Sequence, residues 1–240
     1  IDLTYEEIEA EWNKMLQTVP QIGKFRIIHQ EKKRYTFEDY SSQIGNADAA
    51  LGIWVHKGVI NEKLFEAHPN LKYIATLGHG FEDFDVEMTR RRGVTITNTI
   101  YGDVTIAQYA MALLMNICHN VTVQSDYTKT GYWKEKETNP QASYNQLFVP
   151  QIELYQKTLG IIIDEEALLE ALESRKVYMA GLDVVANEPP QYQIPLMQSP
   201  YTFITSHIAW QPKAARLRAV DLAVKNFRSY LEGMPTSVIN

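Results

Sequence analysis

The chain has 240 residues, of which 45% are apolar, so it can bury a sizeable core as one large domain or two modest ones. Its formal net charge of -6 gives no electrostatic reason to expect nucleic acid or an anionic membrane surface as a partner. No apolar run approaches the length of a membrane span. The single cysteine, Cys118, cannot form an intrachain disulfide, which favours the reducing cytoplasm as the compartment. A small molecule is the ligand class that remains.

Strand-type and helix-type segments alternate over the first hundred residues. Thr4 and Glu7 form a capping box, and apolar positions at helical spacing follow it, which predicts the first helix. Strands are predicted at 25–29, 49–55, 73–77 and 94–98, and helices between them at 36–44, 61–67 and 83–92. This alternation indicates a parallel sheet with right-handed crossovers, so the region is predicted to be a doubly wound α/β domain.

A second region begins with a helix at 104–120 that is apolar on most sides, which is typical of a helix buried between domains or subunits. The stretch 121–150 carries aromatic side chains among polar ones, with few regular elements expected: Tyr127, Tyr132, Trp133, Tyr144 and Phe148. Such a stretch favours a dimerisation arm. The alternative is a surface loop held by its own aromatic side chains.

The remaining elements are predicted to be three strands and two helices. The strands lie at 157–163, 178–185 and 201–205. One helix opens at Asp164 and runs through Ser174, and the last runs over 213–231 before Gly233.

Two short stretches place ionisable residues just past predicted strands, where open α/β sheets bind their ligands. One is GLDVVANEPP (181–190), in which the strand leads into a loop with Asp183 and Glu188. The other is FITSHIAW (203–210), with His207 after the strand. A histidine beside a carboxylate can deliver a proton to a carbonyl near neutral pH. By itself, however, a histidine at such a place is more often structural.

Seven blocks of the sequence, in this order, resemble the D-isomer-specific 2-hydroxyacid dehydrogenases: LKYIATLGHG (71–80), NTIYG (98–102), IAQYA (106–110), KTLGI (157–161), IDEEAL (163–168), LDVVANEP (182–189) and SHIA (206–209). The resemblance implies a flavodoxin-like substrate domain, formed by 1–102 with 212–240. It also implies a truncated Rossmann-type nucleotide-binding domain over 103–211, with a dimerisation arm at 121–150.

The implied activity is the interconversion of a small 2-oxo acid and its D-2-hydroxy acid, with NAD or NADP and no metal, by a homodimer. By resemblance, His207 protonates the substrate carbonyl and Glu188 keeps the imidazole protonated. Backbone amides near Leu77 and Gly78 hold the substrate carboxylate, and Tyr101 is a further candidate for this pocket.

Asp183 matches the position that contacts the nicotinamide carboxamide. Each of the weaker assignments has a structural alternative. In that alternative, Gly78 and Gly80 serve only to form a turn, Tyr101 serves only to pack in the core, and Asp183 serves to cap a loop.

The sequence departs from the family where the dinucleotide would bind. Members place a glycine-rich turn directly after the strand that matches 159–162, because pyrophosphate needs close approach to the backbone at a helix N-terminus. In this chain, Asp164 and two glutamates follow the strand directly. The glycine turn, the acidic residue for the ribose and the substrate-binding arginine are all missing. The one Gly-x-Gly, at 78–80, is followed by Glu82 and Asp83, which would repel phosphate.

Three origins would account for the missing stretch: a longer enzyme of which this sequence omits a part, an engineered deletion, or a naturally shortened relative. We favour the first, because deleting most of a parallel sheet would expose a long strand edge and much apolar surface. The alternative function is a cofactorless, inactive binding or dimerisation module, and a remnant without any ligand is a third reading. The residues that select NAD or NADP fall in the missing stretch.

Overall fold

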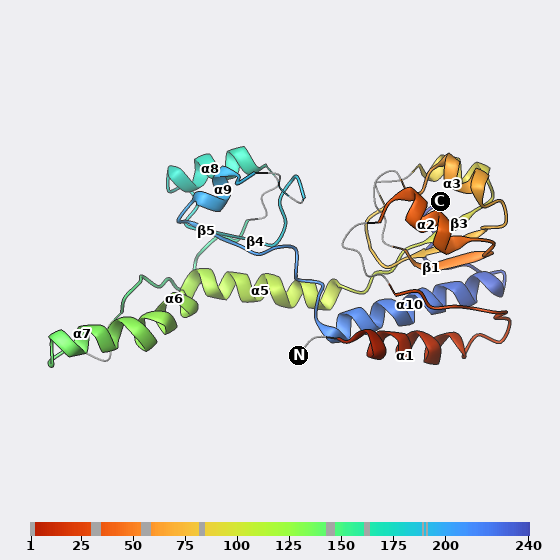
Figure 1. Ribbon diagram of the computed structural model, residues 1–240. Coiled ribbons are helices and arrows are strands. Elements are labelled where there is room, and N and C mark those ends of the chain that lie inside the picture. The colour runs from red at the N-terminus through yellow and green to blue at the C-terminus, as the bar shows by residue number, and fades with distance from the viewer. Residues whose placement is uncertain are drawn as a thin grey trace. The chain divides into compact units, whose positions relative to one another are not determined.

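A computed structural model describes residues 3–29, 35–53, 59–81, 85–142, 147–160, 164–188, 190 and 192–240 (Figure 1). The chain divides into two compact units. Unit 1 comprises Ile1–Asp103 and Gln211–Asn240, and unit 2 comprises Val104–Trp210.

Unit 1 is built on a parallel three-stranded sheet in the order β1-β2-β3. The strands are β1 (Ala49–Ile53), β2 (Tyr73–Thr76) and β3 (Thr95–Thr97), and all four residues of the central strand β2 are buried. Helices α2 (Phe37–Ile44), α3 (Glu62–Ala67) and α4 (Val86–Arg91) pack on one face through a core that includes Leu64, Ile74 and Ile96. The other face packs against α1 (Tyr5–Leu16) and α10 (Lys213–Leu231) (Figure 1). Helices on both faces confirm the doubly wound α/β class.

The helices of unit 1 begin where the sequence places their caps. Thr4 and Glu7 form the predicted capping box, and Thr36 forms a second one with Asp39. Asn61 caps α3 through a hydrogen bond from the Leu64 amide. These side chains satisfy amides that have no partner inside the helix, which fixes the first residue of each element.

The prediction of a strand at 25–29 is wrong. The segment has no ladder partner among the described residues, and the side chains of Phe25 and Ile28 are 41% and 42% exposed. Arg26 instead donates hydrogen bonds to the carbonyls of Gln43 and Ile44 at the end of α2. The segment is therefore held by a side chain rather than by strand pairing. Trp54 and Val55, the end of the next predicted strand, lie outside the described residues.

Unit 2 holds a parallel pair of strands, β4 (Ala180–Leu182) and β5 (Thr202–Ile204). Helices α8 (Glu165–Glu173) and α9 (Pro195–Gln198) cover it through Leu168, Leu172 and Leu196. Helix α5 (Asp103–His119) passes close to β4, because a Cβ added at Gly181 would come within 3.0 Å of Leu113 and Ile117.

The arm-like stretch is more regular than predicted. Helix α6 (Val121–Asp126), the π-helical turn η1 (Tyr127–Gly131) and α7 (Tyr132–Thr138) follow α5 in succession (Figure 1). The rings of Tyr127 and Phe148 stack with centroids 4.3 Å apart, and Tyr132 contacts Trp133 edge to face. Tyr144 lies outside the described residues. Contacts within the stretch thus support the helices, which the aromatic pattern alone did not show.

The predicted strand at 157–163 is wrong over 157–160, where the chain has no regular structure. A parallel strand needs a neighbour to pair its backbone groups, and the strands described in unit 2 pair with each other. Residues 161–163, where the two family blocks join, lie outside the described residues. None of the helices in the described ranges is long and apolar enough to cross a membrane.

Candidate active site

The predicted site residues fall into two groups, one in each unit. Asp183, Glu188 and His207 belong to unit 2, whereas Leu77, Gly78 and Tyr101 are in unit 1. Each group is described within its own unit.

In unit 2 the structure brings the predicted acid and carboxylate together. The Nδ1 atom of His207 lies 2.5 Å from Oε2 of Glu188. The other oxygen of this carboxylate, Oε1, accepts a hydrogen bond from the Val185 amide at 2.9 Å, so the loop holds its own carboxylate in place. The His207 side chain is 56% exposed. Within the described ranges no hydrogen bond to Nε2 of His207 is found.

His207 has a left-handed backbone conformation, with φ of 57°. This region is unfavourable for a residue with a Cβ and is found at functional sites when the surroundings enforce it. The His207 amide donates to the carbonyl of Asp183 at 2.7 Å. This bond ties the segment after β5 to the residue after β4.

The Asp183 carboxylate accepts hydrogen bonds from three donors. Its Oδ1 accepts from the Thr205 hydroxyl at 2.6 Å and from the Ile208 amide at 3.0 Å. Its Oδ2 accepts from the Ala209 amide at 2.9 Å. The structure thus shows Asp183 capping the loop that carries His207. Thr205 takes part in this network and was missed in the sequence; its only signal was a hydroxyl residue two positions before the histidine.

In unit 1 the loop after β2 is fixed through its carbonyl groups. The Gly78 carbonyl accepts from the Thr99 amide at 3.2 Å, and the His79 carbonyl accepts from Asn98 Nδ2 at 2.7 Å. A Cβ added at Gly78 would meet no atom within 4 Å, so the backbone is open there to a ligand. Gly78 does not have positive φ, so the turn itself does not require glycine at this position.

Asn226 of α10 was also missed in the sequence. Its Nδ2 donates to the Asn98 carbonyl at 2.9 Å, and the whole side chain is 5% exposed. A polar residue in the middle of a long helix gives no signal for this contact until the helix is placed against the sheet.

Tyr101 is only 7% exposed, and its carbonyl accepts from the guanidinium of Arg218. Burial raises the pKa of its phenol above the ordinary value, and the nearby Arg216 guanidinium opposes this shift. The phenol therefore stays protonated at neutral pH and is a hydrogen-bond donor.

The residues present do not fit the pyrophosphate of a dinucleotide. In unit 2, helix α8 begins directly after the join, and its N-terminus is capped by Asp164, which accepts from the Ala167 amide at 2.9 Å. Glu165 and Glu166 occupy the first turn. Three carboxylates at a helix N-terminus repel phosphate and occupy the place where phosphate would receive amide hydrogen bonds. Glu82 and Asp83, after the Gly-x-Gly, lie outside the described residues.

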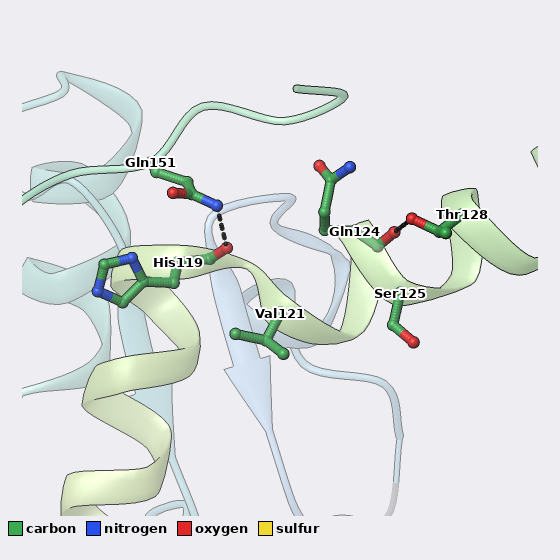
Figure 2. Close-up of a pocket in the computed structure, with 6 residues that line it drawn as sticks. All are labelled: His119, Val121, Gln124, Ser125, Thr128 and Gln151. Carbon is green, nitrogen blue, oxygen red and sulfur yellow. Dashed lines mark hydrogen bonds between the residues drawn. The ribbon is translucent and has the colours of Figure 1, made fainter. Parts of the chain in front are cut away.

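A shallow pocket of 260 Å³ lies at the end of α5 and is separate from the predicted site residues (Figure 2). Gln151 reaches across it to the carbonyl of His119, and Thr128 donates to the carbonyl of Gln124. Most of its lining residues have polar side chains, but the surface that faces the pocket is mainly apolar. None of the predicted catalytic, substrate-binding or cofactor-binding residues lines this pocket.

Comparison with known proteins gives some matches that span nearly the whole chain and others that cover only part of it. The hydroxypyruvate reductase of Blautia hydrogenotrophica is 26% identical over 300 aligned positions, which cover 89% of this chain and 91% of the relative. Because 300 positions exceed the 240 residues of this chain, the alignment contains gaps in this chain.

Two solved structures share the fold. An acyclic imino acid reductase in complex with NADPH and D-Arg superimposes with a TM-score of 0.69 at 15% identity, covering 95% of each chain. The NADPH-dependent glyoxylate/hydroxypyruvate reductase of Sinorhizobium meliloti does so with a TM-score of 0.66 at 19% identity, covering 94% of each chain. Both confirm the Rossmann-like α/β class.

The family description that matches is "D-isomer specific 2-hydroxyacid dehydrogenase, catalytic domain", over residues 3–240. This match confirms the family predicted from the seven blocks. It also confirms the class of reaction that defines the family, the interconversion of 2-oxo acids and 2-hydroxy acids with a nicotinamide cofactor. The chain therefore belongs to the D-isomer specific 2-hydroxyacid dehydrogenase family.

Proposed function

We propose that the chain acts on a small 2-oxo acid and its D-2-hydroxy acid, with His207 as the group that delivers the proton to the carbonyl oxygen. The observation that carries this proposal is the 2.5 Å contact between His207 and Glu188 in a loop with strained backbone. Reduction of a ketone adds a hydride to carbon and a proton to oxygen. His207 supplies the proton from Nε2, and the negative charge of Glu188 stabilises the imidazolium before transfer.

The substrate carboxylate is assigned to the loop after β2, at the amides of Leu77 and Gly78. The open space beside Gly78 supports this assignment, because a ligand oxygen can approach the backbone there. The Tyr101 phenol, kept protonated by burial, is a further donor for the same anion. Glyoxylate and hydroxypyruvate, which relatives reduce according to their names, are the first substrates to try.

The cofactor is assigned as NAD or NADP, which supplies the hydride in this family. Asp183 is the residue for the nicotinamide carboxamide, since Oδ2 carries one hydrogen bond in the structure and can accept a second. Among the described residues no set fits the pyrophosphate, so no step is assigned to the bound dinucleotide.

That misfit is the basis of the alternative, an inactive binding or dimerisation module without cofactor. The carboxylates at the start of α8 are the observation behind it. The two proposals differ in one measurement: the fluorescence of NADH or NADPH on mixing with the protein. Enhancement supports the dehydrogenase, and its absence at cofactor concentrations up to the millimolar range supports the module.

Homodimerisation is proposed through α5 and the 121–150 stretch. Apolar side chains on these elements are more than 40% exposed in the single chain: Val104, Ile106, Met111, Met115, Val121, Trp133, Leu147 and Phe148. Large apolar side chains that are exposed in the single chain can be buried in a subunit interface. The cytoplasm is proposed as the compartment because Cys118 is a free, buried thiol.

His207→Asn is the variant that tests the function. Asparagine tolerates the left-handed backbone but cannot donate a proton as an acid near neutral pH. We expect the rate of NADH or NADPH oxidation with glyoxylate or hydroxypyruvate to fall by about 100-fold or more. His119→Asn, in the separate pocket, should keep the wild-type rate. A wild-type rate in His207→Asn contradicts the proposed role.

A further inference from the structure

The loop that carries His207 is held in place by hydrogen bonds to one carboxylate, that of Asp183. Asp183 accepts from the side chain of Thr205 and from the amides of Ile208 and Ala209. These donors lie on both sides of His207 in the sequence, and the His207 amide itself donates to the Asp183 carbonyl. Asp183 thus accepts four hydrogen bonds from the segment around the histidine, three from backbone amides and one from a side-chain hydroxyl.

We infer that Asp183 is a positioning residue that enforces the left-handed backbone of His207 and so aims its ring at Glu188. The inference rests on the proposed role of His207. A residue with a Cβ leaves the left-handed region unless other contacts compensate. The structure compensates for this backbone strain through the Asp183 carboxylate, which accepts hydrogen bonds from two amides and a hydroxyl.

Asp183 also helps to place Glu188, the residue that His207 contacts. Glu188 lies five residues after Asp183, and its carboxylate is anchored to the Val185 amide of the intervening loop. Asp183 therefore joins the two loops whose side chains meet at 2.5 Å. Loss of its carboxylate separates the pair without removing either member.

The chemistry requires a carboxylate rather than an amide. Both oxygens of Asp183 accept hydrogen bonds, whereas asparagine has one acceptor oxygen and an NH₂ group that would face an N–H donor. Asp183→Asn keeps the shape of the side chain and breaks the network. Asp164→Asn is the matched control, because Asp164 also accepts from a backbone amide in unit 2, at α8.

The test is an NMR experiment on the whole chain, which needs no turnover. In the wild type, His207 Nδ1–H should give a downfield, hydrogen-bonded resonance, and the Ile208 and Ala209 amides should exchange slowly. In Asp183→Asn we expect this resonance to disappear and exchange of the two amides to accelerate by about 10-fold or more. Asp164→Asn should change neither. An unchanged His207 resonance in Asp183→Asn overturns the inference.

Two further variants cover the case in which Asp183→Asn does not fold. Thr205→Val removes one hydrogen bond to Asp183 at nearly constant shape and should weaken the His207 signal in the same direction. His207→Gly should raise Tm when Asp183 is present, because glycine has no left-handed strain, and should raise it less in the Asp183→Asn background. Equal gains in both backgrounds contradict the inference. These readouts are independent of activity, so an inactive wild type would refute the proposed function and leave the positioning result intact.

Discussion

Gly131 has no Cβ, which leaves room for the Tyr127 ring in the π-helical turn η1. A Cβ at this position would lie 2.5 Å from Cδ2 of Tyr127, whose ring covers the glycine. That ring also stacks on Phe148, and its hydroxyl donates to Glu135 at 2.6 Å. The glycine therefore lets one aromatic ring connect three parts of the stretch.

We predict that Gly131→Ala destabilises the chain by about 1–3 kcal/mol, because the ring must move from its contacts. Urea unfolding measures the change. Gly160→Ala is the control, since an added Cβ there meets no atom within 4 Å. Tyr127→Ala removes the ring, so Gly131→Ala should cost little in that background. An equal cost with and without the ring would refute this explanation.

Asn226 provides a second prediction for a single residue. It is buried and donates to the Asn98 carbonyl, so Asn226→Ala leaves that carbonyl without its partner. The expected loss is about 1–3 kcal/mol in the free energy of unfolding. Lys225→Ala, which removes only an exposed pair with Asp221, should cost less than about 0.5 kcal/mol. Equal losses in both variants would show that the buried hydrogen bond contributes little.

The sequence predicted the charged residues of the candidate site but not the hydrogen bonds that hold them in place. His207 and Glu188 could be paired because each follows a strand-type run and matches a family block. The three hydrogen bonds of Asp183 depend on how β4 and β5 align, which no local pattern contains. Thr205 and Asn226 were missed for the same reason.

At the scale of elements, α1 and α10 are joined by a charged contact between Glu7 and Lys213. Lys213 and the Thr4 backbone amide hold the pKa of Glu7 below its usual value. A lowered pKa stabilises the fold above the unfolded pKa, and this stabilisation is lost as the pH falls through the folded value.

We therefore predict that Glu7→Gln lowers Tm at pH 7 and that the difference from wild type shrinks below about pH 4. Thermal melts followed by circular dichroism over this pH range provide the measurement. Glu170→Gln, at an exposed position of α8, serves as the control. A difference that persists unchanged at low pH would assign the effect to packing instead of charge.

Helix starts were predicted better than strands, because a cap is a local interaction and a strand is not. Thr36, Asn61 and Asp164 each accept an amide of their own first turn, so the pattern and the contact lie within four residues. The segments at 25–29 and 157–160 have the composition of strands but lack neighbours with which to pair. A strand thus depends on residues far away in the sequence, and here also on those missing at the join.

At the scale of the whole molecule, the prediction concerns association. Size-exclusion chromatography with light scattering should give about twice the 27.6 kDa of one chain if α5 and the 121–150 stretch form the proposed interface. Met111→Glu places a charge on the exposed face of α5 and should yield the monomer. Tyr192→Glu, at an exposed aromatic position outside these elements, should leave the dimer intact. A wild-type monomer contradicts the proposal.

The small sheet of unit 2 determines which part of the protein should unfold first on heating. It consists of two paired strands of three residues each, and such a pair is marginal by itself, whereas β2 in unit 1 is buried along its whole length. Opening on heating should therefore begin where His207 and Glu188 reside. The loop at Gly78 should keep its shape to a higher temperature. A warmed sample would lose the contact between His207 and Glu188 while the loop at Gly78 is still folded.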